Sequence, residues 1–163
     1  MLFHSRMVDS NRLAAAMTLG AVAGMRAFMA PAAVAARLAR RPWSWRRNRA
    51  ERLLRKRSVR RFFLVMAAAE LAGDKLPFIG DRIAAGPLAA RAASGALAGW
   101  SVARRREAAP QFAVAGAAAA IATAYVAWRL RRFIATESVV PDAIAGIYED
   151  VVAIALARGI RFP

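Results

Sequence analysis

The segment Ala67–Pro77, AAAELAGDKLP, places three charged residues inside an otherwise apolar run. In a helix, Glu70 and Asp74 would lie one turn apart on the same face, with Lys75 rotated by roughly 100° from Asp74. Charged side chains near the middle of a membrane-spanning helix are costly, so they need partners or a function. We therefore interpret this segment as part of a polar centre inside a helical membrane protein.

The composition is typical of a membrane protein in which apolar and basic residues are segregated along the chain. The 163 residues are 59% hydrophobic, and 26 Lys and Arg against 10 Asp and Glu give a formal net charge of +16. The absence of cysteine excludes disulfides, thiolate catalysis and thiolate metal sites. His4 is the only histidine, so one subunit cannot assemble a His-ligated zinc site or a His-based triad. We expect no cofactor, although carboxylates alone could still hold a metal ion.

Five apolar segments predict an all-α, polytopic membrane bundle of four to five spans in a single domain. They are Leu13–Ala39, Phe62–Ile79, Ile83–Ala103, Ala108–Trp128 and Val139–Ala157. A helix needs about 20 apolar residues to cross the hydrocarbon core, and the fourth segment carries no charge over its whole length. The last segment carries three acidic residues, which leaves open whether it spans the bilayer or re-enters it.

The segment Arg40–Arg61 carries 11 of the 26 basic residues and follows a short polar tail, residues 1–11, and the first apolar segment. Two interpretations stay open: a cytoplasmic loop that sets topology, or an interfacial helix that binds anionic lipid headgroups. We do not expect nucleic acid as the main partner, because basic loops beside spans usually serve topology. The charge bias predicts a multi-pass protein of the bacterial inner membrane, with the N-terminus outside and the C-terminus in the cytoplasm.

Prolines and glycines predict where the helices break and where they pack closely. We expect breaks at Pro31 and Pro77, because proline cannot continue the intrahelical hydrogen-bond ladder. Two small-residue steps allow helix backbones to approach closely, and they also favour a homo-oligomer. The four glycines of these steps are Gly20, Gly24, Gly95 and Gly99.

Seven charged residues fall near the centres of the predicted spans, three of them positive and four negative. They are Arg26, Lys75 and Arg91, with Glu70, Asp74, Glu149 and Asp150. We expect them to face inward and to meet, with Arg26 close to Glu70, because each isolated charge would cost at least about 2.5 kcal/mol in the bilayer. The same residues fit an ion-pair network that fixes helix register, or a polar pathway.

Several of these residues occur in an order that points to a family. The pattern comprises Gly24, Arg26 and Pro31, then Glu70, Asp74, Lys75 and Pro77 as ExxxDKxP, then Arg91 and Gly95, and finally the pair Glu149 and Asp150. From about Ala21 to Leu156 the chain thereby resembles a bacterial family of small membrane proteins catalogued as domain of unknown function 4126. The resemblance implies an integral membrane protein, and it implies no particular activity.

The leading hypothesis is a polar intramembrane site or pathway for a small solute, an ion or a proton. Arg26 and Arg91 would orient the carboxylates or bind an anionic group, while the acidic residues would bind a cation or carry protons. The alternative is a non-catalytic scaffold with a structural ion-pair core and a basic segment bound to anionic lipid. We do not expect an enzyme, because no phosphate loop, nucleophile elbow or His-bearing metal motif accompanies the carboxylates.

Overall fold

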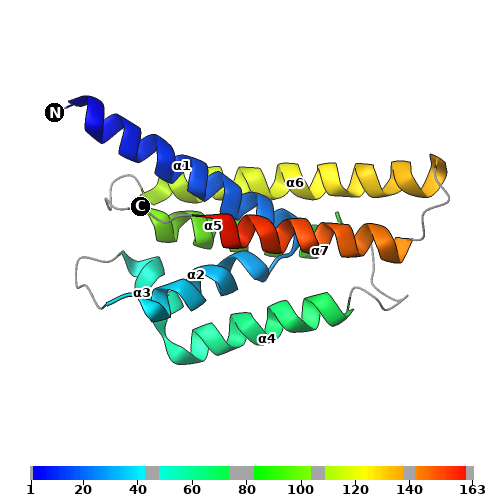
Figure 1. Ribbon diagram of the computed structural model, residues 1–163, viewed down its shortest axis with the longest axis horizontal. Helices are drawn as coiled ribbons and strands as arrows, with labels where there is room; N and C mark the ends of the chain where they lie inside the picture. The colour runs from blue at the N-terminus through cyan, green and yellow to red at the C-terminus, as the bar shows by residue number, and fades with distance from the viewer. Residues whose placement is uncertain (1, 43–47, 74–82, 104–108, 138–141, 161–163) are drawn as a thin grey trace.

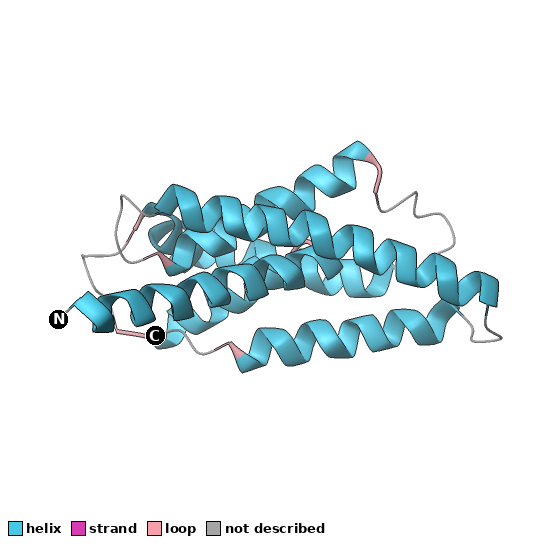
Figure 2. Ribbon diagram, turned by 90° about the horizontal axis from the view of Figure 1, so that it is seen from above, coloured by secondary structure: helices cyan, strands magenta, loops and turns pink. Residues whose placement is uncertain are grey.

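Every regular element in the described part of the chain is an α-helix (Figure 1). The computed structural model describes residues 2–42, 48–73, 83–103, 109–137 and 142–160. The helices are α1 (Leu2–Met25), α2 (Met29–Arg40), α3 (Arg49–Arg55), α4 (Arg57–Gly73), α5 (Ala85–Val102), α6 (Ala109–Glu137) and α7 (Asp142–Gly159). The view from above shows the same elongated bundle of helices (Figure 2). The all-α prediction is thereby confirmed for these residues.

The centre of the bundle is formed by α1, α5 and α6, which approach one another at glycines. A Cβ atom added to Gly95 would lie 2.5 Å from the carbonyl oxygen of Gly116, and one added to Gly20 would collide with the same oxygen. A Cβ atom added to Gly24 would collide in the same way with the carbonyl oxygen of Ala120. One added to Gly99 would collide with the carbonyl oxygen of Phe112. Only residues without a side chain allow backbones to pack this closely. The glycines therefore hold α1 and α5 against α6.

The segment 13–39, which we predicted as one continuous span, is instead a helical hairpin. The helix α1 ends at Met25, and α2 starts at Met29 and runs back toward the end at which α1 began (Figure 1). Arg12 and Leu38 line the same small cavity of about 30 Å³, whereas a straight helix would separate them by about 39 Å. The expectation that this segment crosses the bundle once is therefore wrong.

The break precedes the proline that predicted it by about one turn. Pro31 has no N–H, and its ring clashes with the carbonyl of the residue four positions earlier, which is Ala27. The ladder of α1 accordingly ends with the 2.8 Å bond from the Arg26 amide to the Val22 carbonyl. Pro31 itself lies in the first turn of α2, where proline is tolerated. The chain thus reverses at residues 26–28.

The turn of the hairpin lies beside the middle of α6. A Cβ atom on Gly24 would lie 2.8 Å from the Cβ atom of Thr123, which is the central residue of α6. Among the described residues, one helical stretch is long and apolar enough to cross a membrane, and it is Ala109–Ile134 of α6. The hairpin therefore reaches half-way along this helix.

The ends of α2, α5 and α7 gather at one end of the bundle, together with the starts of α1, α3, α4 and α6 (Figure 1). We refer to it as the basic end, because its basic side chains bind the last carbonyl groups of these helices. Arg55 donates to the Leu38 carbonyl at 2.9 Å, Arg12 to that of Val102 at 3.1 Å, and Arg37 to that of Ala157 at 3.2 Å. Cations are favourable at helix C-termini, where the macrodipole is negative.

The described parts of Arg40–Arg61 are anchored to the bundle and are neither a free loop nor a single interfacial helix. They comprise the end of α2, the short helix α3 and the first turn of α4, while residues 43–47 lie outside the described residues. Asn48 is 4% exposed and donates to the carbonyls of Trp100 at 2.9 Å and Ala103 at 2.8 Å. Residues 2–11, which we interpreted as part of a short polar tail, instead form the first turns of α1, which begins at Leu2.

Adding a methyl group at Gly116 tests the glycine packing. We expect Gly116→Ala to lower the free energy of unfolding by about 1–3 kcal/mol or more, because the new Cβ would overlap the Gly95 backbone. The matched control is Gly86→Ala in the first turn of α5, where nothing lies within 4 Å of the new Cβ. Denaturant unfolding of the purified variants in detergent gives both values. Equal stability of the two variants would contradict the packing described here.

Candidate functional site

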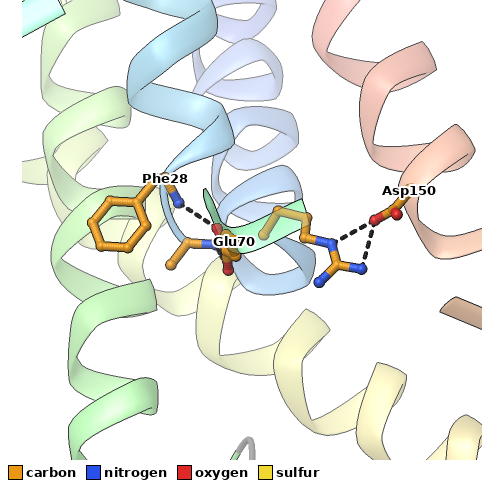
Figure 3. A network of polar contacts seen from close by, with 5 residues as sticks. Phe28, Glu70 and Asp150 are labelled. Atoms are coloured by element: carbon orange, nitrogen blue, oxygen red, sulfur yellow. Dashed lines mark hydrogen bonds and ion pairs between the residues drawn. The ribbon is translucent and has the colours of Figure 1, made fainter. Parts of the chain in front are cut away.

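The break between α1 and α2 leaves the amides of a helix start in the middle of the bundle. The residue before α2, Phe28, supplies no side-chain cap. The amides of Ala27 and Phe28 instead donate to the two carboxylate oxygens of Glu70, at 2.8 and 3.0 Å (Figure 3). A negative charge is favourable at a helix N-terminus, where unpaired N–H groups and the macrodipole point at it. A carboxylate from α4 thus caps α2 from outside the hairpin.

The guanidinium of Arg26 pairs with Asp150 at the same turn (Figure 3). Its Nε atom donates to one carboxylate oxygen at 2.6 Å, and its Nη2 atom lies 2.5 Å from that oxygen. Arg26 is 2% exposed and the side chain of Asp150 is 18% exposed. A buried charge without its partner is strongly destabilising, whereas the complete pair is tolerated. The pair therefore fixes the turn against the middle of α7.

Aromatic contacts hold α4 in the position from which Glu70 reaches the turn. None of the residues of α4 is buried, so the helix lies at the periphery of the bundle. The Phe28 ring lies 6.3 Å from the Phe62 ring and 6.4 Å from the Phe63 ring, measured between centroids. Phe63 and Glu70 are seven residues apart and so share one face of α4. This face contacts the start of α2 through the Phe63 ring and the Glu70 carboxylate.

The structure brings three of the seven predicted charges to the turn and describes two more. Glu149 is half-buried on α7 next to Asp150, and Arg91 is 7% exposed on α5, one turn before Gly95. Asp74, Lys75 and Pro77 lie outside the described residues. Arg26 and Glu70 do meet at one turn, but Glu70 binds the backbone there and Asp150 pairs with the guanidinium. No group of three or more candidate metal ligands occurs among the described residues.

A groove of about 610 Å³ runs between α6 and α7 and starts next to the turn. Met25, the last residue of α1, lies at its inner end together with Thr123. Its walls are mostly apolar, with one basic and one acidic side chain. The remaining lining residues are Val126, Ala127, Leu130, Arg131 and Ile134 of α6, and Tyr148, Glu149 and Val152 of α7.

Sequence reasoning missed the buried Asn48, although a local signal marks it. Asn48 followed three residues later by Glu51 matches the pattern of a helix start, and the Glu51 amide does donate to the Asn48 side chain at 2.8 Å. The contact of this side chain with α5 has no local signal. The same holds for Arg131, whose place beside α7 depends on how two distant helices meet.

A family model described as Domain of unknown function (DUF4126) matches residues 13–159. The chain belongs to this family. The match includes Arg26, Glu70 and Asp150, and it confirms the resemblance that the ExxxDKxP pattern indicated. No curated protein and no solved structure matched the chain. Because the DUF4126 description names no activity, function has to be argued from the site itself.

A double-mutant cycle tests the pair at the turn. We expect Asp150→Leu to lower the free energy of unfolding by about 3–5 kcal/mol, because the Arg26 charge would stay buried without its partner. Adding Arg26→Met should recover much of this loss, since no charge then remains at the position. Val151→Ala, at an exposed position of α7, should change stability by only about 0.5 kcal/mol. Denaturant unfolding in detergent measures Asp150→Leu, Arg26→Met, the double variant and the Val151→Ala control, and additive losses in the double variant would refute the pairing.

Proposed function

We propose that the protein is a multi-pass membrane protein whose α1–α2 hairpin enters the bilayer and turns near its middle, where it forms a polar site for a small solute or ion, with a proton or small cation fitting best. The observation that carries this proposal is the turn at residues 26–28. It lies beside the centre of the apolar α6 and is bound by carboxylates from α4 and α7.

Exposed apolar side chains support the membrane placement. Soluble monomers rarely expose contiguous apolar patches larger than a few hundred Å². Here α4, α6 and α7 carry many exposed large hydrophobic residues, namely Phe62, Leu64, Val65, Val114, Ile121, Tyr125, Val126, Leu130, Phe133, Ile144, Ile147, Tyr148, Val151, Val152, Ile154 and Leu156. Lipid would cover this surface. Arg91, the one charged residue of α5, is buried in the bundle and would not face lipid.

Helix lengths fit a bilayer with the hairpin reaching its middle. The helices α4, α5 and α7 have 17, 18 and 18 residues, or about 25–27 Å each, against a hydrocarbon core of about 30 Å. The 12 residues of α2 correspond to about 18 Å, slightly more than half of that core. An α2 that starts at the bilayer centre would therefore end at the interface.

The distribution of charge supports a cytoplasmic basic end. Among the described residues, the basic side chains at this end are Arg12, Arg37, Arg40, Arg41, Arg49, Arg52, Arg55, Lys56, Arg57, Arg60, Arg61 and Arg158, whereas Arg129, Arg131 and Arg132 lie toward the opposite end. Cytoplasmic segments carry the excess of Lys and Arg. Because the hairpin returns to its starting side, α1 and α7 would both have their outer ends in the cytoplasm. The proposed N-terminus is therefore cytoplasmic, and not outside as five single-crossing spans predicted.

The chemistry of the turn supports a cation or proton as the bound species. Transporters commonly place the ends of broken helices at the bilayer midplane, where helix dipoles and freed backbone groups bind substrates and coupling ions. Here a proton on Glu70 would remove the charge that caps α2 and turn one acceptor oxygen into a donor. Binding at this carboxylate would thereby be coupled to the position of the peripheral helix α4.

The scaffold hypothesis remains the second candidate, and one observation favours it. Glu70 and Asp150 each already hold a structural partner at the turn. A network of this kind could serve only to stabilise a broken helix, with the basic end contacting anionic headgroups.

Reconstitution into vesicles of phosphatidylethanolamine and phosphatidylglycerol tests the proposal. With an internal pH dye and imposed proton and potassium gradients, we expect the wild type to raise ion flux above that of empty vesicles. Glu70→Gln should return the flux to that of empty vesicles, because it removes the charge at the turn. Glu51→Gln, a matched change at the basic end, should not alter it. Wild-type flux equal to that of empty vesicles, or flux unchanged in Glu70→Gln, would contradict the site.

A charge exchange separates the two candidates. Arg26→Asp combined with Asp150→Arg keeps an opposite-charge pair and should preserve folding. A pathway predicts that this folded variant loses the wild-type flux, whereas a scaffold predicts that neither protein conducts.

A further inference from the structure

We propose that the groove between α6 and α7 binds one acyl chain of an anionic phospholipid, with the lipid phosphate at the Arg131 end. This inference rests on the membrane placement proposed above, and it assigns a ligand to a surface outside the polar site. The groove has the shape, the apolar lining and the charge at its mouth that such a lipid requires.

The groove is long and apolar enough for an acyl chain. Its α6 wall extends from Thr123 to Ile134, about 16 Å along the helix. The volume of about 610 Å³ lies within the range of ligand pockets. Val126, Leu130, Tyr148 and Val152 line it and are also exposed, so that the groove opens directly onto the apolar surface of α6 and α7. A chain in the bilayer can enter it sideways.

A basic residue, Arg131, lies at the mouth of the groove. The guanidinium of Arg131 reaches across to α7, where its Nη2 atom would lie 2.9 Å from a Cβ atom on Gly146. Trp128, Arg129 and Arg132 belong to the same end of α6 but line a separate pocket outside the groove, where the Arg132 guanidinium lies 4.9 Å from the centre of the Trp128 ring. Tryptophan and arginine are typical of membrane interfaces, and guanidinium groups bind phosphate oxygens well. The headgroup would therefore sit here.

The position of Glu149 fixes the direction of the lipid. It lines the groove about one turn further along α7 than Gly146, closer to the turn of the hairpin. A carboxylate at this depth repels an anionic headgroup, so that the phosphate stays at the mouth and the chain points inward. Because Met25 lies at the inner end, the chain would end directly beside residue Arg26.

Charge also disfavours a second copy of the protein as the occupant. A copy related by a two-fold axis would bring its own Arg131 toward the same mouth. Like charges that face each other across an interface are destabilising, whereas an anionic lipid complements them.

A photo-crosslinking lipid tests the assignment. The probe is phosphatidylglycerol with a diazirine in the middle of one acyl chain, in vesicles that contain the full-length protein, and mass spectrometry maps the labelled residues. We expect labelling of Val126, Leu130 and Val152 to exceed that of the exposed α4 residues Leu64 and Val65. Ala127→Trp fills the groove and should lower the labelling by about tenfold or more. Ala122→Trp, an exposed position of α6 outside the lining, should leave it unchanged.

Even labelling of all exposed helix faces would overturn the proposal, as would labelling that Ala127→Trp does not lower in a protein that still floats with the vesicles. Cross-links between two copies through Val126 would instead assign the groove to a subunit interface and would also overturn it. Protein that fails to float with the vesicles refutes the membrane placement as well. Loss of ion flux with groove labelling intact counts against the polar site alone.

Discussion

The contact between the Glu70 carboxylate and the amides of Ala27 and Phe28 is the interaction on which the hairpin depends. A broken helix exposes backbone donors, and in an apolar environment each unpaired donor costs several kcal/mol. The chain supplies no local cap at Phe28, so a side chain from another helix must do it. The pairing of Arg26 with Asp150 compensates the buried guanidinium at the same turn, and the Glu70 carboxylate remains as the charge that caps α2.

The glycine contacts of α1 determine where the turn lies in the bundle. Gly20 and Gly24 let α1 lie directly on α6, and this places residues 26–28 at the middle of the longest helix. The same geometry sets the inner end of the α6–α7 groove at Met25. The polar turn and the apolar groove are therefore neighbours, because Met25 lines the groove and the next residue, Arg26, belongs to the turn. A ligand in either one would act on the hairpin turn from its own side.

Sequence reasoning predicted the helices and the meeting of charges better than the path of the chain. Apolar length alone indicated α5, α6 and α7 to within a few residues, except for the longer C-terminal end of α6. The reversal at residues 26–28 was not predicted, because 13–39 is long enough to span and Pro31 indicates a break without its direction. That direction depends on distant contacts such as Arg37 with the end of α7. Charge balance likewise could not select Asp150 over Glu70 as the partner of Arg26.

The most direct test of the hairpin is a distance between its two outer ends. The chain contains no cysteine, so single cysteines at the exposed positions Asn11 and Arg40 accept spin labels without competing sites. A straight helix would separate these positions by about 44 Å. The hairpin predicts a distance between the two spin labels of less than half that value, measured by pulsed electron paramagnetic resonance in both detergent and vesicles. A distribution centred near the straight-helix value would contradict the account.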